Sequence, residues 1–500
     1  MQLKYFFYSL FTATVLASCV KLTEKPDAFV SADDYYNTKT DALAAVNSIY
    51  YALNSPNGTQ VPYNVLFVTG MEFMTDDIKM GPGATNPDVK AQSTLDHSAS
   101  TLRVKEIWQK HFIAISRANI AIDKIPKIKA QTTADAELLS RLVLEARFLR
   151  GLFYFNLVRL FGDVPLVLHE TTSLDKEQLN LRRTSADSIY AQVIQDFTEA
   201  EKLPWRYLPT EADAGRATGA AAKALLSLVY LTRSDWQKAI DKSNEIINRP
   251  DRYYDLFTNY ADVFNKAAKN GKEHIFSAQF KSNANGHGNN FALRCAPLGI
   301  KGINGNLADE PTVDLINAFR DSDKRKAVTL ASSYTIGTTT YKVDPAQNDG
   351  LSYVVNKYFD PELPGNLNES GINVPIIRYA EVLLINAEAN NELHGPNSDA
   401  YQNYNLIRSR AGLPTFTGLT ANLTKDQFRD SLYRDRRLEL TFEYHRWFDL
   451  IREIDKDGNR IMVKTLRAIG KPSASNKHLL YPVPQVERDI NPLLTQNPGW

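Results

Sequence analysis

The 500-residue sequence predicts a mainly α-helical protein, built from helical hairpins with an inserted irregular region of loops and short strands. Over most of the chain, apolar residues recur at intervals of three and four, which is the periodicity of an amphipathic helix. Between about residues 253 and 371, this pattern gives way to glycine turns and short strand-like runs. Because loops on a rigid scaffold commonly carry recognition, we expect residues 253–371 to lie on the ligand side.

The first residues have the form of a segment for export. An apolar stretch from Tyr5 to Ala17 is too short to span a bilayer but suits a secretory signal peptide over residues 1–18. It ends in Leu16-Ala17-Ser18-Cys19, which resembles a bacterial lipobox, where the cysteine is acylated after cleavage. The alternative is an ordinary cleaved signal with an incidental cysteine. We expect lipidation at Cys19, followed by a polar tether over residues 19–31.

Three helices are predicted in the first third of the chain. The pattern Asp41–Leu53 is amphipathic, and after an irregular region over about residues 54–100 the helical period resumes at 103–125. The strongest pattern runs from Leu142 to Leu160. Its N-cap signal is Thr132 with Asp135, and Gly162 followed by Pro165 is expected to end it.

Of the five remaining predicted helices, one stands alone and four form two pairs. Their expected ranges are 184–202 with Thr184 as its cap signal, 217–232 and 235–248 with Ser234 as the N-cap between them, 375–393, and 398–411. Helix pairs of this length, with small residues on one face, resemble tetratricopeptide repeats. We therefore expect a tetratricopeptide-like helical-hairpin scaffold.

Composition and the absence of several motifs exclude some classes of function. The formal net charge is +1 and charged residues make up 23 % of the chain, so no basic excess favours nucleic acid as a partner. The sequence contains no Walker loop, nucleophile elbow, zinc-ligand spacing or dinucleotide fingerprint. With Cys19 lipidated, the only other cysteine, Cys295, has no partner for an internal disulfide. No cofactor or metal is expected.

The first candidate ligand-binding patch lies in the irregular region 54–100. It mixes aromatic rings with hydrogen-bond acceptors, a mixture that suits sugars. Its residues are Tyr63, Phe67, Glu72, Phe73, Asp76 and Asp77. In this interpretation, loss of the Phe73 or Asp76 side chain weakens ligand binding without unfolding the protein. The alternative is that the aromatic residues belong to the core and that Asp77 is a cap or turn residue.

The second candidate patch is the glycine-rich segment 283–294. Its predicted ligand-binding residues are Asn289, Asn290, Phe291 and Arg294. A polar loop with one aromatic ring suits a lid over a ligand, and it equally suits a loop that only faces solvent. The sequence leaves both interpretations open.

The segment 434–452 offers acids and an imidazole but is not predicted to be catalytic. On a continuous helix its opposite charges would be neighbours three or four residues apart. The expected pairs are Arg436 with Glu439, Glu443 with Arg446, His445 with Asp449, and Asp449 with Arg452. The following Asp455-Lys456-Asp457-Gly458-Asn459 lacks the spacing of a calcium loop and predicts a tight turn.

Several motifs in order along the chain resemble the SusD/RagB family of outer-membrane nutrient-binding lipoproteins, named for a starch-utilisation system. After the lipobox, these are Ser31-Ala32-Asp33-Asp34-Tyr35-Tyr36, Glu145-Ala146-Arg147-Phe148-Leu149-Arg150-Gly151, Leu160-Phe161-Gly162-Asp163-Val164-Pro165, Arg378-Tyr379-Ala380-Glu381, Arg436-Arg437-Leu438-Glu439-Leu440, His445-Arg446-Trp447-Phe448-Asp449, Tyr481-Pro482-Val483-Pro484 and Gln496-Asn497-Pro498-Gly499. Two positions depart from the family pattern. Tyr444 stands where glycine is usual, and Asp435 where glutamate is more frequent.

The resemblance implies one SusD-like domain over residues 32–500. Its helical scaffold would comprise about 32–252 and 372–453, with the loop-rich region 253–371 between them and a C-terminal segment at 454–500. The resemblance also implies a surface lipoprotein of the outer membrane without catalytic residues. Such a protein captures an oligosaccharide, less commonly a peptide, and delivers it to a SusC-like TonB-dependent transporter. Two alternatives are a lipid-anchored glycoside hydrolase and a helical-repeat scaffold that binds only protein.

Overall fold

The structure is a computed structural model that describes residues 36–54, 61–173, 175–284 and 286–500. The predicted signal peptide, the lipidation site Cys19 and the tether lie outside the described residues. Within the described ranges, no helix combines the length and the apolar character needed to cross a membrane.

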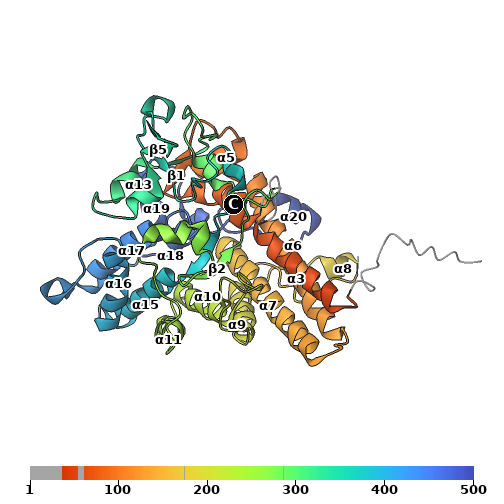
Figure 1. Cartoon of the computed structure of the whole chain (residues 1–500). Coiled ribbons are helices and arrows are strands. Elements are labelled where there is room, and N and C mark those ends of the chain that lie inside the picture. Colours follow the sequence, from red (N-terminus) through yellow and green to blue (C-terminus); the bar gives the residue numbers. More distant parts are fainter. Residues whose placement is uncertain (1–35, 55–60, 174, 285) are drawn as a thin grey trace, which may run out of the picture.

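Long helices form the body of the protein and confirm the predicted mainly α fold. In chain order they are α3 (Lys39–Asn54), α6 (Leu102–Lys124), α7 (Thr133–Phe161), α9 (Ala186–Ala200), α10 (Gly219–Thr232), α11 (Trp236–Ile247), α15 (Tyr379–His394), α16 (Ser398–Arg410) and α17 (Lys425–Leu440). From α3 to α11 each helix packs on the next, α15 packs on α11, and α16 and α17 pack on α15. The result is a continuous stack of helices beneath the inserted region (Figure 1).

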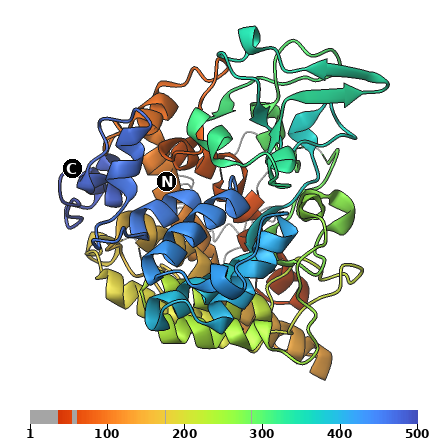
Figure 2. The ribbon, with the colours of Figure 1, turned by 90° about the vertical axis from the view of Figure 1, so that its left-hand side faces the viewer.

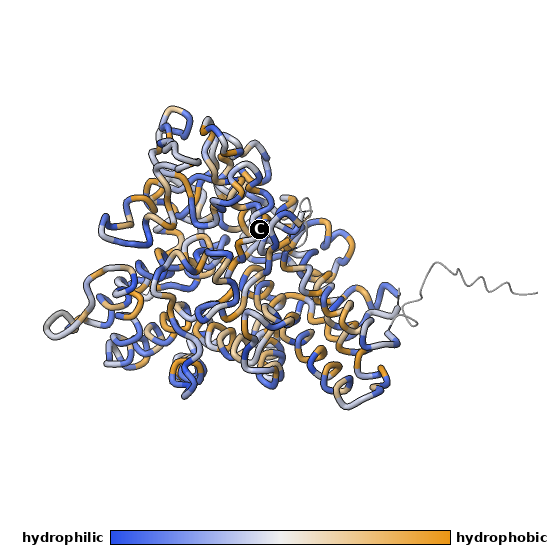
Figure 3. The backbone as a smooth tube through the Cα atoms, viewed as in Figure 1, coloured by the Kyte–Doolittle hydropathy of each residue, from blue (hydrophilic) through white to orange (hydrophobic). Residues whose placement is uncertain are grey.

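Local sequence explains where the longest helix begins and ends. The Thr132 hydroxyl accepts a hydrogen bond from the backbone N–H of Asp135 at 3.1 Å, as the predicted N-cap requires. Gly162 ends α7 with φ +68°, a conformation that glycine adopts without a steric penalty. Between these ends, the side chains of Leu142, Leu149 and the other core positions of α7 are fully buried between α6 and α9. Figure 3 shows the corresponding alternation of apolar and polar segments along the helices.

The region between α11 and α15 contains short helices and antiparallel strand pairs, one of which includes a strand, 78–80, from the N-terminal irregular region. The pairs are β2 (His274–Ala278) with β8 (Val374–Arg378), β1 (Ile78–Met80) with β3 (Asp309–Pro311), β4 (Leu330–Ala331) with β7 (Val354–Val355), and β5 (Ser333–Ile336) with β6 (Thr339–Lys342). The short helices are α12 (Phe291–Cys295), α13 (Val313–Ala318) and α14 (Lys326–Thr329). The β2–β8 pair closes this region against α10, whereas β5 and β6 project away from the helical stack (Figure 2).

Short elements also occupy the segments that the sequence pattern left irregular. They include the π-helical turn Pro62–Leu66, α4 (Phe67–Gly70), the 3₁₀ turn Glu72–Met74, α5 (Pro87–Thr94), α8 (Lys176–Leu179), α19 (Met462–Ala468) and α20 (Gln485–Ile490). A further short helix, α18 (Arg446–Arg452), lies within the segment 434–452. The predicted turn at 455–459 is confirmed, because Asp455 Oδ1 accepts hydrogen bonds from the backbone N–H groups of Asp457 and Asn459.

Three predicted helix starts are corrected. The helix predicted from residue 375 begins at Tyr379, because Val374–Arg378 pairs with β2 as a strand. The cap of α9 is Ser185, since Thr184 instead forms a β-bridge with Val164. Ser234 does not cap α11. It has φ +58° and forms the turn before Asp235, which is the N-cap residue.

The predicted continuous helix over 434–452 is broken into α17 and α18. The break lies at 441–445, where Phe442 and Tyr444 adopt φ of +60° and +66°. Left-handed backbone favours glycine, which explains why glycine suits position 444. Here a buried tyrosine side chain occupies that position, and its ring packs against Phe67 at a centroid distance of 5.9 Å. The turn changes which charged side chains of this segment become neighbours.

Candidate functional site

The first predicted patch lies in the core of the protein. Tyr63 is 5 % exposed, and the other five residues, Phe67, Glu72, Phe73, Asp76 and Asp77, are at most 1 % exposed. The Tyr63 and Phe67 rings meet edge to face at 5.1 Å. Burial raises the pKa of Glu72 well above its usual range, and the nearby carboxylates of Asp77 and Asp76 add to this effect. A ligand-binding role requires exposed surface that these side chains lack.

Arginines from distant parts of the chain hold the two aspartates of this patch. Arg446 forms two hydrogen bonds to Asp76, from Nε to Oδ1 and from Nη2 to Oδ2, both at 2.8 Å. Arg437 donates from Nε to Asp77 Oδ1 at 2.7 Å. The Lys471 ammonium group donates to the backbone carbonyls of Phe73 and Thr75. The patch therefore joins the N-terminal part of the chain to α17, α18 and the C-terminal segment.

The second predicted patch is divided between core and surface. Asn289 and Phe291 are each 1 % exposed, and Asn289 Oδ1 accepts a hydrogen bond from the backbone N–H of Phe291 at 2.9 Å. Arg294 is half-buried and forms a bidentate ion pair with Asp309. Asn290 is also half-buried. Among the described residues of this segment, Asn283 and His287 are exposed, and the His287 ring lies edge-on to Tyr51 at a centroid distance of 6.2 Å.

The charged segment 434–452 forms a buried ion-pair network with partners that differ from the predicted ones. Of the four predicted pairs, only Asp449 with Arg452 forms an ion pair, at 2.8 Å. In the other three predicted pairs, the side chains form ion pairs with other residues instead. Their actual partners are Asp449 and Glu381 for Arg436, Lys357 and Arg378 for Glu443, Asp76 and Glu453 for Arg446, and Glu381 for His445. This supports the structural role predicted for the segment, through contacts that span the fold.

Glu439 lies at the centre of this network. Three guanidinium groups surround it, those of Arg378 at 2.7 Å, Arg325 at 3.4 Å and Arg410 in a still shorter contact. Burial alone would raise the pKa of Glu439, but Arg410, Arg378 and Arg325 outweigh burial and lower the pKa to about 2. In the unfolded chain the ordinary value is 4.5.

We expect this carboxylate to make the protein acid-sensitive. Because the folded pKa is lower than the unfolded pKa, the stabilisation is fully present above about pH 4.5 and is lost as the pH falls toward about 2. The loss attributable to Glu439 is about 3 kcal/mol, from a shift of this order. Urea unfolding at a series of pH values measures it. A free energy of unfolding that stays constant from pH 5 to pH 2.5 would contradict this assignment.

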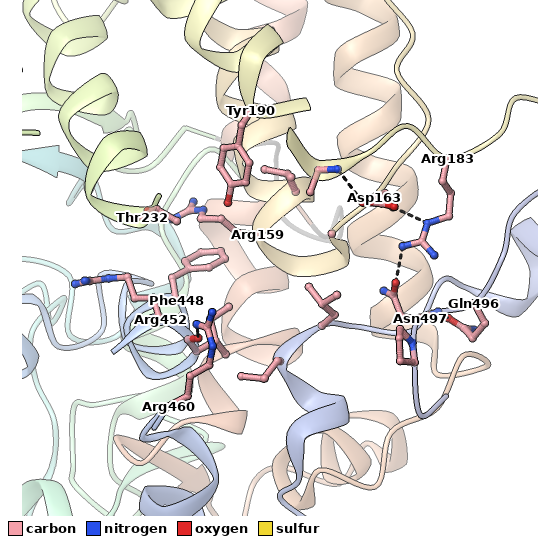
Figure 4. A pocket seen from close by; sticks show the side chains of 17 residues that line it. Arg159, Asp163, Arg183, Tyr190, Thr232, Phe448, Arg452, Arg460, Gln496 and Asn497 are labelled. Carbon is pink, nitrogen blue, oxygen red and sulfur yellow. Dashed lines mark hydrogen bonds between the residues drawn. The ribbon is translucent and has the colours of Figure 1, made fainter. Parts of the chain in front are cut away.

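A solvent-facing pocket of about 650 Å³ lies between helices and the C-terminal segment. Its lining includes Arg159 of α7, Tyr190 of α9, Phe448 of α18 and Arg460 of the turn after α18. The Arg159 guanidinium lies 3.6 Å from the centre of the Phe448 ring. Figure 4 shows Tyr190, Arg159, Phe448, Arg452 and Arg460 on one side of the pocket, with Asp163, Arg183 and Asn497 on the other.

Two other hollows of similar volume have a different lining. One, of about 640 Å³, is lined mainly by apolar side chains, including Trp108, Phe112 and Leu179. The other, of about 670 Å³, lies along the first turns of α7 and mixes small and aliphatic residues with polar ones, but it has no aromatic ring in its described lining. Only the pocket at Arg159 combines aromatic rings with several guanidinium groups among these three. Ligand-binding sites combine apolar surface with a few polar groups that orient the ligand, so this pocket is the strongest candidate for the ligand site.

Arg159, Tyr190 and Arg460 are not among the site residues predicted from sequence. They are separated along the chain, and only the packing of α9 and α18 against the end of α7 brings them together. A signal did exist in the motifs. Gly162 and Asp163 of the motif 160–165 and Gln496-Asn497-Pro498 of the C-terminal motif both line the pocket.

Comparisons with known proteins match nearly the whole chain. The SusD family profile matches residues 234–500, and a profile described as "Starch-binding associating with outer membrane" matches residues 30–231. SusD-like protein P2 of Formosa agariphila is 27 % identical, and the match covers 97 % of each chain. The starch-binding protein SusD of Bacteroides thetaiotaomicron is 24 % identical over 83 % of this chain and 82 % of its own.

Solved structures share the fold. A laminarin-binding SusD-like protein superposes with a TM-score of 0.75 at 23 % identity, covering 93 % of this chain and all of that chain. The predicted family resemblance is thereby confirmed in sequence and in architecture. On the strength of the profile match over residues 234–500, this protein belongs to the SusD family.

Proposed function

We propose that this protein captures an oligosaccharide at the cell surface and delivers it, unaltered, to a SusC-like TonB-dependent transporter of the outer membrane. In this proposal, acylation of Cys19 anchors the chain to the outer membrane, and residues 19–31 tether the domain. The observation that carries the proposal is family membership along the chain, together with relatives described as binding starch and laminarin.

The pocket chemistry supports carbohydrate as the ligand class. The Tyr190 ring offers an apolar face, and the Tyr190 hydroxyl and the arginines offer hydrogen-bond donors. Sugars present C–H faces together with hydroxyl acceptors, so both kinds of contact are available to them. A pocket of about 650 Å³ has the size range of ligand sites.

Calorimetric titration with neutral and acidic oligosaccharides tests the proposal, alongside an assay for new reducing ends. We expect binding without release of reducing ends. Tyr190→Ala is expected to weaken binding about tenfold, because it removes an aromatic face worth about 1 kcal/mol or more together with a hydroxyl. Protein-dependent release of reducing ends would instead identify a glycoside hydrolase. Absence of any glycan binding, with retained binding to the transporter, would identify a protein-binding scaffold.

Tyr51→Ala is the matched control, because Tyr51 is an exposed tyrosine outside the pocket and lies beside His287 of the second predicted patch. Unchanged affinity in Tyr51→Ala with loss in Tyr190→Ala places the ligand in the pocket. The opposite result would move the ligand to the segment 283–294, as the sequence analysis predicted, and would leave glycan capture intact.

A further inference from the structure

Arg159 is a partly buried cation that has no carboxylate partner in the part of the chain that the structure describes. Its two hydrogen bonds go to neutral groups on its own helix, from Nε to the Phe155 carbonyl at 3.2 Å and from Nη2 to Asn156 Oδ1 at 2.7 Å. A guanidinium has five N–H donors, so both N–H groups on Nη1 lack a described partner. Most other buried arginines of this protein pair with carboxylates.

Two phenyl rings hold this guanidinium in place. Arg159 Cζ lies 3.8 Å from the centre of the Phe155 ring and 3.6 Å from that of Phe448. Cation–π contacts of this kind stabilise the charge but use none of its N–H donors. Burial lowers the pKa of Arg159 to about 10, so the group stays protonated at neutral pH. The pocket therefore contains a rigid, charged donor.

The other charged groups of the pocket leave it positive. Arg460 donates to the Ile451 carbonyl, and Arg183 donates to backbone and amide oxygens, but neither forms an ion pair with a described carboxylate. Arg452 differs, because Glu388 and Asp449 neutralise it. Asp163 is the only acidic residue in the described lining. This excess of positive charge contrasts with the formal net charge of +1 for the whole chain.

We propose that the pocket binds the anionic substituent of an acidic sugar, a carboxylate or a sulfate, with Arg159 and Arg460 as the groups that contact it. This inference rests on the proposed function and names its substrate class. Guanidinium groups match the planar geometry of a carboxylate and the oxygen face of a sulfate. Because Phe155 and Phe448 already fix Arg159, little side-chain entropy is lost when a ligand binds. The Tyr190 hydroxyl is positioned to contact the neighbouring sugar.

Affinity measurements with matched glycans test this inference. The probes are polygalacturonate and alginate oligosaccharides as carboxylates, carrageenan oligosaccharides as sulfates, and maltoheptaose and laminariheptaose as neutral controls. We expect at least one acidic probe to bind about tenfold more tightly than the neutral probes at low salt. We also expect this preference to shrink as sodium chloride is added, because salt screens the charge on partly exposed groups. The carboxylate and sulfate arms identify which anion is recognised.

Three variants separate recognition from structural support. Arg460→Ala removes a surface guanidinium and is expected to weaken acidic-glycan binding about threefold. Arg159→Gln is expected to weaken it about tenfold or more, because it removes the charged donor. Arg320→Ala, which removes an exposed arginine of the inserted region, is the control and is expected to change nothing. Thermal melting of each variant shows whether the domain remains folded.

The binding results for the probes and variants either support or overturn the proposal that the pocket binds an acidic sugar. If only neutral glycans bind, or if Arg460→Ala and Arg159→Gln bind acidic glycans as tightly as the unaltered protein, the inference is overturned and glycan capture stands. If no glycan of either kind binds, both proposals are overturned. Selective loss of acidic-glycan affinity in the two folded variants, with the Arg320→Ala control unaffected, supports it.

Discussion

The Asp76→Ala variant is expected to be less stable than the unaltered protein by about 3–5 kcal/mol, the usual cost of removing one partner from a buried ion pair. The loss removes the bidentate partner of Arg446, which keeps a 3.5 Å contact to Glu453, and it removes the 3.2 Å contact to Arg437. Asp76 is fully buried, and Arg437 and Arg446 lower its pKa despite burial, so the aspartate is ionised in the folded protein. Urea unfolding followed by circular dichroism measures the difference.

Asp314→Ala is the matched control for this variant. Asp314 pairs with Arg437 at 2.8 Å, as Asp76 does at 3.2 Å, but its side chain is 48 % exposed. Exposed ion pairs contribute little, so we expect a change within about 1 kcal/mol. Equal stability of Asp76→Ala and Asp314→Ala would refute the assignment of Asp76 to a buried structural pair. In that case the earlier interpretation, that Asp76 serves the ligand and not the fold, would be restored.

Arg378→Ala is expected to have the largest effect on stability of any single substitution in the network. All five donors of Arg378 are used, by Glu443 twice, by Glu273, by the Glu439 carboxylate and by the Glu439 carbonyl. The substitution leaves these carboxylates buried with fewer counter-ions, and burial of an uncompensated charge is costly. We expect a loss of about 5 kcal/mol or more, which for many domains equals the entire free energy of unfolding.

The expected result is therefore low soluble yield, or an unfolding midpoint far below that of the unaltered protein. Arg378→Lys keeps one positive charge but loses the planar set of donors, and we expect an intermediate loss. Lys202→Ala is the surface control. Lys202 pairs with Glu199 while both side chains are well exposed, so its removal should change the free energy of unfolding by less than about 1 kcal/mol. An Arg378→Ala protein as stable as Lys202→Ala would show that the network does not stabilise the fold.

The buried ion pairs of Asp76 and Arg378 show why the ligand site was difficult to predict from sequence. Aromatic rings next to carboxylates suit a sugar site, but they also suit a buried segment whose acids are paired elsewhere. The partner of Asp76 is Arg446, 370 positions along the chain, and nothing near Asp76 indicates that pairing. The same holds for Glu443, whose partner Arg378 lies on the strand β8.

The sequence by itself determined the positions and ends of helices, which depend on nearby residues, and the family to which the chain belongs. Helix period, the Thr132 cap and the Gly162 terminus depend on residues within a few positions of one another, so they were predictable. The order of the motifs was enough to indicate the family.

Tertiary structure alone decided the partners of the buried charges and the location of the pocket. Two left-handed residues, Phe442 and Tyr444, turn the chain between α17 and α18, and most charged side chains of this segment pair with residues outside it. The pocket forms where α7, α9, α18 and the C-terminal segment meet. Such sites depend on contacts between segments that are remote in sequence, because the free energy of burial and ion pairing depends on which surfaces are brought together by folding.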